Sequence, residues 1–255
     1  VGCKMSHNIL MYLQLSRRDA NDRYLMSGDS NWNFMKHIIN MLAENKNTID
    51  VIIPKTRQRV EDSRILLSHI TYNVRNNVKF KEINYADDVF GSRFYFPLDI
   101  INILKSTQYS LIWCNDPCLS QNFKIFSPKS KIISYNHWVD FPSDKKSPNG
   151  FTYAYRQAEA AEISDVYLFN SDFHINEFNR QFKNTIFHNN ANIKSLSPIL
   201  DNQVMRTFHN RIKILYNHRL SSQKQYKDAF INFCKAVKGF ENKVDIYLTN
   251  PECKQ

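Results

Sequence analysis

The sequence predicts an α/β protein built on a parallel β-sheet with helices on both faces. Short apolar segments typical of buried strands recur along the chain, and segments with helical spacing of apolar residues separate them. Hydrophobic residues make up 42% of the 255 residues and charged residues 23%, which is an ordinary balance for a globular protein. Because parallel strands need crossover connections, strands that alternate with helices favour a parallel sheet.

The first half of the chain contains predicted strands and helices in alternation. In the segment 32–44, Phe34, Ile38 and Met41 recur every three or four positions, as on one face of a helix. Pro54 is expected to end the second strand, and Pro97 to lie near the first turn of a helix. The predicted strands are 8–15, 50–53, 78–83, 109–114 and 131–135, and the predicted helices are 32–44 and 97–105.

The second half repeats this alternation after residue 150. Ser171 is predicted to be the N-cap of a helix, and Gly239 to close the last helix. Residues 190–211 show weak periodicity and contain Asn, Ser and Pro, so we interpret them as a linker between residues 1–189 and 212–255. The predicted helices are 152–163, 171–182 and 223–238, and the predicted strands are 165–169, 212–216 and 244–248.

Charge and cysteine content limit the classes of protein that remain. The net charge is +10 and the pI is near 9.3, which indicates either a basic soluble surface or a polyanionic partner such as nucleic acid. The five cysteines are odd in number and scattered, so we expect a reducing, cytoplasmic compartment rather than a disulfide framework. No stretch approaches the roughly 20 apolar residues of a membrane-spanning helix, and residues 1–8 lack the apolar run of a signal peptide.

Cys114 and Cys118 form the one close pair of cysteines. No second pair and no nearby pair of histidines completes a zinc site around this C-x3-C spacing. We therefore expect two small core residues at a strand end, and no metal.

The loops that follow strands carry the candidate site residues, because ligands of parallel sheets bind beyond the carboxyl ends of the strands. The loop N-H-W-V-D-F-P places His137 and Asp140 three residues apart, where an imidazole and a carboxylate can share acid–base work. Asn115 and Asp116 occupy the equivalent place after the preceding strand. The alternatives are a solvated turn with a structural His137, and an Asp116 that only caps a helix.

A second cluster follows the strand 212–216. The strand delivers Asn217, His218 and Arg219 to its carboxyl end, and Lys224 follows after four residues at the start of the next helix. The guanidinium fork, the ammonium and the helix N-terminus can converge on one diphosphate. The alternative is a solvated basic turn.

Residues 212–238 resemble the opening of the nucleotide-binding domain of GT-B glycosyltransferases of the group 1 kind. That family has a strand, an Arg and then a Lys after four intervening residues, as Arg219 and Lys224 stand here. His218 occupies the place of the family's usual Gly, and the resulting His-Arg pair is similar to relatives of tRNA-queuosine mannosyltransferase. His137 stands where the family often has a His that faces the reacting sugar, and the segment 169–171 resembles the last strand-to-helix turn of the same domain.

The resemblance implies a GT-B fold with residues 1–189 as the Rossmann-like acceptor-side domain and 212–255 as the beginning of the Rossmann-like nucleotide-sugar domain. It also implies a nucleoside-diphosphate sugar as the donor, with UDP-glucose as our assignment, and no required cofactor or metal. Only 44 residues lie between 212 and 255, too few for a complete second domain of about 100 residues, so we expect the chain to continue past Gln255.

Other nucleotide-dependent classes lack their motifs here. G-x-G-x-x-G and G-x-x-x-x-G-K-[ST] are absent, which disfavours nicotinamide dehydrogenases and P-loop NTPases. G-x-S-x-G is absent, which disfavours an α/β-hydrolase. Asp-x-Asp is absent too, which disfavours the metal-dependent GT-A transferases.

The acceptor is predicted from basic and aromatic residues in the site loops. Arg17 and Arg18 follow the first strand and could track a phosphate backbone, while Trp138 and Trp32 could stack on a base. In this respect the chain resembles virus-encoded DNA glucosyltransferases, which decorate hydroxymethylated bases, so our first expectation is a DNA acceptor and a virus-encoded enzyme in the host cytoplasm. The alternatives are transfer to tRNA, glycan or protein, and a non-catalytic nucleic-acid-binding module.

Overall fold

The structure is a computed structural model, and it describes ten segments of the chain. They are residues 6–13, 27, 30–55, 61–84, 96–136, 150–182, 192–196, 212–217, 226–240 and 243–249. The chain divides into two compact units, Val1–Ile199 and Leu200–Gln255, and each is considered by itself.

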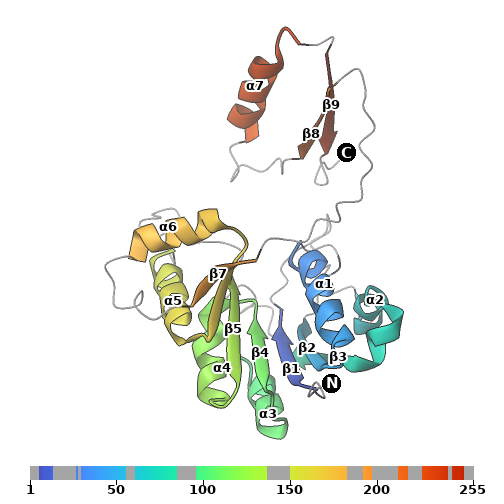
Figure 1. The fold of residues 1–255 in the computed structure, drawn as a ribbon, viewed down its shortest axis with the longest axis vertical. Coiled ribbons are helices and arrows are strands. Elements are labelled where there is room, and N and C mark those ends of the chain that lie inside the picture. The colour runs from blue at the N-terminus through green and yellow to red at the C-terminus, as the bar shows by residue number, and fades with distance from the viewer. Residues whose placement is uncertain are drawn as a thin grey trace, which may run out of the picture. The chain divides into compact units, whose positions relative to one another are not determined.

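The first unit contains a seven-stranded parallel sheet with the order β3-β2-β1-β4-β5-β6-β7 (Figure 1). From β1 the chain steps outward to β3, and it then returns to add β4 to β7 on the other side of β1. The predicted parallel α/β sheet is therefore confirmed. The strands are β1 (Asn8–Tyr12), β2 (Thr48–Lys55), β3 (Val78–Asn84), β4 (Leu111–Cys114), β5 (Lys131–Asn136), β6 (Val166–Phe169) and β7 (Ile193–Ser195).

Helices connect these strands and lie on both faces of the sheet (Figure 1). The four helices that the sequence predicts in this unit are all present, with boundaries that shift by at most two residues. They are α1 (Ser30–Glu44), α3 (Leu98–Ser106), α5 (Gly150–Ile163) and α6 (Asp172–Phe182). The structure adds α2 (Ser63–Ser68), α4 (Ser120–Phe126) and the 3-10 helices η1 (Tyr72–Asn77) and η3 (Pro117–Leu119), which the sequence did not predict. Among the described residues, no helix is long and apolar enough to cross a bilayer.

Two sequence predictions about strands need correction. Pro54 does not end β2 but pairs in register with Ile83 of β3. Among the described residues, β2 pairs beyond Ile52 with β3 alone, so the missing N–H of Pro54 can face the side on which no described strand pairs. In addition, β7 lies inside the segment 190–211 that the sequence predicts as a linker, because three residues with no hydrophobic pattern pair with β6.

Alternate side chains of the central strands enter two different cores. Ile9 and Met11 of β1 pack on the face that α1 covers, whereas Leu10 and Tyr12 pack on the opposite face with residues of α3 and α4. This period of two is what strands buried on both faces require. Trp32 of α1 is fully buried in the first of these cores and donates from Nε1 to His69 Nδ1 at 2.9 Å, so the suggestion that it stacks on a base is wrong.

A buried charge cluster joins β2, β3 and the segment before β4. The Asp50 carboxylate accepts a hydrogen bond from the Tyr109 hydroxyl at 2.6 Å and lies 2.9 Å from Lys81 Nζ. Burial and the neighbouring Asp50 charge raise the pKa of Tyr109, so its hydroxyl keeps the proton that it donates. Lys81 and Tyr109 thus supply the polar partners that the buried Asp50 carboxylate needs.

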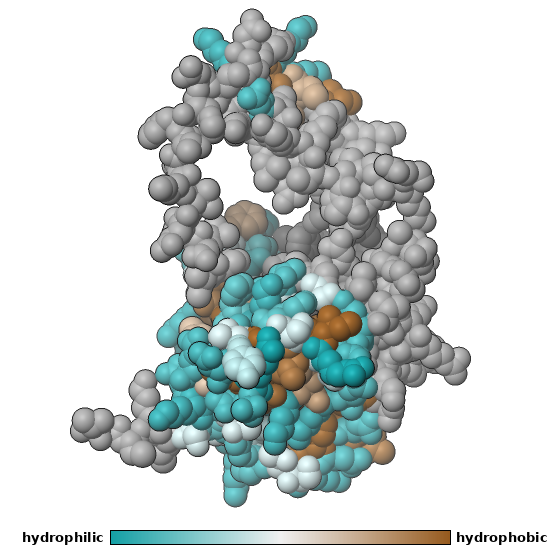
Figure 2. Space-filling view, turned by 90° about the vertical axis from the view of Figure 1, so that its right-hand side faces the viewer, coloured by the Kyte–Doolittle hydropathy of each residue, from teal (hydrophilic) through white to brown (hydrophobic). Residues whose placement is uncertain are grey.

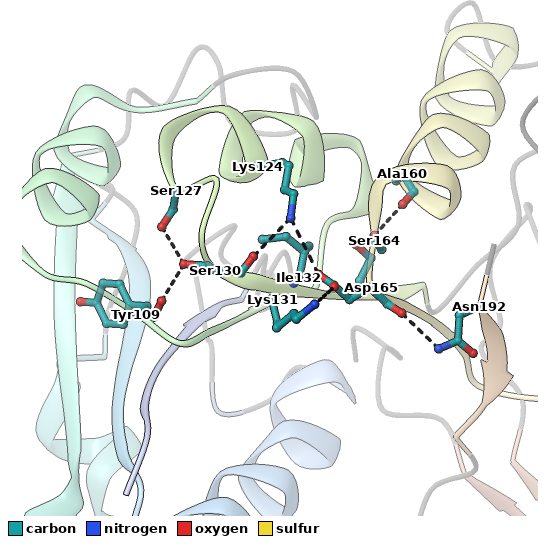
Figure 3. A network of polar contacts seen from close by, with 11 residues as sticks. Tyr109, Lys124, Ser127, Ser130, Lys131, Ile132, Ala160, Ser164, Asp165 and Asn192 are labelled. Atoms are coloured by element: carbon teal, nitrogen blue, oxygen red, sulfur yellow. Dashed lines mark hydrogen bonds and ion pairs between the residues drawn. The ribbon is translucent and has the colours of Figure 1, made fainter. Parts of the chain in front are cut away.

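Residues at the amino ends of β4 to β7 form a second polar network (Figure 3). Asp165 accepts from Lys131 Nζ at 2.7 Å and from the backbone N of Ile132 at 2.9 Å, and its carbonyl accepts from Asn192 Nδ2 at 3.1 Å. Burial raises the pKa of Asp165, but these hydrogen bonds and the charge of Lys124 outweigh it, so the pKa of Asp165 is lowered. Asp165 thus links the starts of three adjacent strands, with its carboxylate bonded to β5 and its backbone carbonyl bonded to Asn192 before β7.

The surface of the first unit is mixed. Figure 2 shows a predominantly hydrophilic face on which hydrophobic residues are scattered among polar ones. The outer strand β3 exposes the charged side chains of Lys79 and Glu82, and the other outer strand, β7, is three residues long.

The described part of the second unit is a strand–helix–strand motif. It consists of β8 (Ile212–Asn217), α7 (Tyr226–Val237) and β9 (Val244–Thr249), and the two strands pair in parallel from Ile212–Val244 to Asn217–Thr249. Gly239 closes α7 with a φ of 89°, in the left-handed region that favours glycine, as the sequence predicts.

We expect Asp165→Asn to lower the free energy of unfolding by about 1–2 kcal/mol at pH 7, because the charge-assisted bonds to Lys131 and Ile132 weaken. A lowered carboxyl pKa stabilises the fold at pH values above 3.8, the ordinary pKa of an aspartate. This stabilisation is lost as the pH falls through the pKa of Asp165 in the folded protein. The difference between the two proteins should therefore shrink at pH 3. Urea denaturation at both pH values measures it, and an equal difference at both would contradict this account.

Candidate active site

The carboxyl ends of β4, β5 and β6 bring asparagines to one edge of the sheet. Asn115 follows β4, Asn136 is the last residue of β5, and Asn170 follows β6. Because parallel strands all point in the same direction, these residues lie at the same edge, which we call the carboxyl edge. The predicted candidate loops after these strands begin here.

Asn115 is held on two sides. Its backbone N donates to the carbonyl of Tyr12 at the end of β1 at 3.0 Å, and its Oδ1 accepts from Trp113 Nε1 at 2.9 Å. The side chain is buried, with 8% of the residue exposed, and its Nδ2 has no hydrogen-bond partner in the part of the chain that the structure describes. Asn115, which the sequence predicts to bind the acceptor substrate, is therefore an amide held in place at the carboxyl edge.

Asp116 caps the short helix η3, which is the alternative to substrate binding that the sequence offered for this residue. Its Oδ1 accepts from the backbone N of Cys118 at 3.2 Å, and the residue is 2% exposed. This contact accounts for an aspartate before Pro117. The acceptor-binding role of Asp116 stays a prediction.

The two cysteines at this edge are core residues, as predicted. Cys114 and Cys118 are both buried, and the Cys114 thiol donates to the carbonyl of Asp116 at 2.9 Å. Burial raises the pKa of the Cys114 thiol, so it stays protonated and unreactive. Across the described segments, no group of three or more His, Cys, Asp or Glu side chains could hold a metal ion.

Asn136 fixes the end of β5 where the predicted catalytic loop begins. The side chain is buried, and its Nδ2 donates to the Tyr167 hydroxyl of β6 at 3.1 Å. The next residue is His137, which together with Trp138 and Asp140 lies outside the described residues. The structure thus anchors the base of this loop, and the roles of these three side chains stay predictions.

Sequence reasoning missed His174 in the first turn of α6. Its ring Nδ1 lies 2.8 Å from Ser171 Oγ, and its backbone N donates to the Ser171 carbonyl at 3.1 Å. Burial lowers the pKa of His174, so the imidazole is neutral at pH 7. The S-x-x-H spacing at a predicted helix start was the signal that could have found this pair.

Glu61 connects segments that follow two different strands of the same sheet. Its carboxylate is buried and accepts from the backbone N of Ser27 at 2.7 Å and also from the Ser27 hydroxyl. Ser27 belongs to the segment between β1 and α1. Arg17 and Arg18, the predicted phosphate contacts of that segment, lie outside the described residues.

The predicted diphosphate site belongs to the second unit. Asn217 is the last residue of β8 and pairs with Thr249, so the strand ends one residue later than predicted and places Asn217 at its carboxyl end. The helix α7 begins at Tyr226, three residues later than predicted and two residues after Lys224. His218, Arg219 and Lys224 lie outside the described residues, in the connection between β8 and α7.

No protein-family model matches the sequence, and no curated protein matches it. Solved structures do match. A protein from E. coli, described as trehalose-6-phosphate bound with UDP-2-fluoro glucose, aligns with a TM-score of 0.54 at 10% identity over 95% of this chain and 64% of its own. UGT89C1 from Arabidopsis thaliana, complexed with UDP-L-rhamnose, aligns with a TM-score of 0.53 at 12% identity over 98% of this chain and 70% of its own.

A third match is HepE from Anabaena in complex with UDP-glucose. It aligns with a TM-score of 0.52 at 12% identity over 95% of this chain and 69% of its own. At such identities the similarity shows the fold alone, and it shows that this chain has the GT-B fold predicted from the sequence. The chain spans between 64% and 70% of the length of these three proteins.

We expect His174 to titrate below its ordinary pKa of 6.5, because burial disfavours the charged imidazole. A lowered histidine pKa means that the unfolded chain binds the proton more tightly, so stability decreases as the pH falls below 6.5. NMR titration of the imidazole C–H signals measures the pKa, and His174→Gln assigns the signal by its loss. A midpoint at or above 6.5 would refute the expectation.

Proposed function

We propose that the protein is a glycosyltransferase that moves a hexosyl group, which we assign as glucose, from a nucleoside-diphosphate sugar to an acceptor hydroxyl. The observation that carries this proposal is the fold, because the chain aligns over at least 95% of its length with the three solved structures described above. Each of those proteins was solved with a UDP-sugar or its fluoro analogue, which supports UDP-glucose as the donor here.

The connection between β8 and α7 supports a diphosphate site. Arg219 follows the end of β8 by two residues, and Lys224 precedes α7 by two. A helix N-terminus with two cations in the preceding loop suits the leaving diphosphate, since backbone N–H groups and positive side chains all favour its negative charge. Asn217 and His218 belong to the same proposed site.

In the reaction, the acceptor oxygen bonds to the anomeric carbon of the sugar, and the bond from that carbon to the diphosphate oxygen breaks. Arg219 and Lys224 neutralise the charge that develops on the leaving diphosphate, and these two cations can do so without a metal ion. His137 and Asp140 follow β5 in the sequence. One of them takes the proton of the acceptor hydroxyl if the reaction inverts the anomeric centre, or donates or accepts a hydrogen bond at the sugar if the reaction retains it.

The acceptor that we propose is a hydroxylated base in DNA. The net charge of +10 supports a polyanionic partner, and Arg17, Arg18 and Trp138 follow strands that end at the carboxyl edge. Asn115 and Asp116 complete the proposed acceptor site. Transfer to tRNA, a glycan or a protein, or nucleic-acid binding without catalysis, are the alternative outcomes of the test.

We expect Arg219→Ala and Lys224→Ala each to lower turnover by about 10²–10³-fold, or about 2.7–4 kcal/mol, as the loss of one transition-state donor typically does. The assay measures release of UDP from UDP-glucose in the presence of hydroxymethylated DNA, unmodified DNA, tRNA or an oligosaccharide. The fold should be unchanged, because the described strands and helix of the second unit include neither residue.

Lys238→Ala is the matched control, because Lys238 is an exposed cation just beyond the other end of α7. It should leave turnover within twofold of the wild type. Near-normal turnover in both Arg219→Ala and Lys224→Ala would sink the assignment of the diphosphate site. Salt-dependent DNA binding without UDP release would favour the non-catalytic module instead.

A further inference from the structure

Asn115 holds a buried amide that the fold itself does not satisfy. The residue is 8% exposed, and its Nδ2 has no hydrogen-bond partner within the described residues. Buried polar side chains in native proteins nearly always have a partner, so each exception needs an explanation. A bound ligand that supplies the acceptor is one such explanation.

Trp113 determines which end of this amide stays available. An indole N–H can donate but cannot accept, so the atom that faces Trp113 Nε1 at 2.9 Å must be the Asn115 oxygen. Trp113 is itself buried in the core that α1 covers. The free end of Asn115 is therefore a hydrogen-bond donor, and it is held in that orientation before any ligand arrives.

The location of Asn115 favours a bound ligand, rather than imperfect packing, as the reason why its Nδ2 has no partner. Its backbone N bonds to the Tyr12 carbonyl at 3.0 Å, so it lies where β1 and β4 are neighbours. From these two strands the chain proceeds toward opposite ends of the sheet. In open parallel sheets, ligands bind at this switch point, beyond the carboxyl ends of the strands.

We propose that Asn115 Nδ2 donates a hydrogen bond to an oxygen of the acceptor substrate, and that Trp113 is the positioning residue that fixes the amide for this purpose. A hydroxyl oxygen that accepts this bond keeps its own proton free for removal by a base. This inference rests on the proposed function and deepens it by naming the hydroxyl-recognising contact.

Asn47 offers a matched control within the same sheet. It is 7% exposed and directly precedes β2, at the opposite edge of the sheet. Its Oδ1 accepts from the backbone N of His7 at 3.1 Å, and its Nδ2 donates to the Leu42 carbonyl at 2.9 Å. Both ends of the Asn47 amide are thus used by the fold, whereas only one end of Asn115 is.

The test measures steady-state kinetics with UDP-glucose and duplex DNA that contains 5-hydroxymethylcytosine. Asn115→Asp keeps the oxygen that accepts from Trp113 but removes the donor, so KM for the DNA should rise by about tenfold or more while KM for UDP-glucose stays unchanged.

Trp113→Phe frees the amide to rotate and should raise KM for the DNA by about threefold. The double variant should have the same KM for the DNA as Asn115→Asp alone, because Trp113 acts only through Asn115. Asn47→Asp should lower the thermal stability and leave both KM values unchanged.

Three results would overturn the inference. The first is an Asn115→Asp protein with normal KM for the DNA, or, if that variant does not fold, a normal KM in Asn115→Ala. The second is a pair of effects from Trp113→Phe and Asn115→Asp that multiply in the double variant. The third is absence of UDP release by the wild-type protein with this DNA, which removes the proposed DNA acceptor and this inference with it, whereas the first two leave the proposed function standing.

Discussion

The structure depends on the pairing of β1 with two neighbours. Residues Asn8–Tyr12 bond to β2 on one side and to β4 on the other, and both of these strands run parallel to β1. The side chains of β1 alternate between two cores, so every residue from Ile9 to Tyr12 is buried. Because the chain leaves this central strand first toward one end of the sheet and later toward the other, the switch point and the buried Asn115 lie together at its carboxyl end.

The two edges of the sheet use polar groups differently. At the amino ends, Asp165 and Ser130 bond to groups of neighbouring segments (Figure 3). Asn47 does the same before β2, and these bonds stabilise the strand starts that they join. At the carboxyl edge, Asn115 keeps one end of its amide unused by the described residues. Asn136 and Asp116 at this edge bond within the fold, so the unused amide end of Asn115 is what distinguishes it from them as well as from Asn47. Variants of Asn115 and Asn47 should therefore be distinguishable by whether KM or stability changes.

Much of this architecture could be predicted from the sequence because its central strands are buried on both faces. Such strands appear as continuous apolar runs, as in residues 111–114, and the helices between them carry regular apolar spacing. β7 could not be predicted, since its three residues have no pattern and gain their order from pairing with β6. The position of Asn115 follows from the end of a predicted strand, but the orientation of its amide depends on the Trp113 contact, which the order of residues does not reveal. The Ser171–His174 pair could have been found from the S-x-x-H spacing, but only together with the predicted start of the helix.

The outer strands of the sheet have a consequence for how copies of the chain behave in a crowded solution. A sheet grows between molecules when a long, uncharged outer strand offers its free backbone groups to a second chain. Here one outer strand, β3, carries exposed charges at Lys79 and Glu82, and the other, β7, has only three residues to offer. Strand-to-strand aggregation is therefore discouraged at both ends, and a concentrated preparation should resist forming fibres through this sheet.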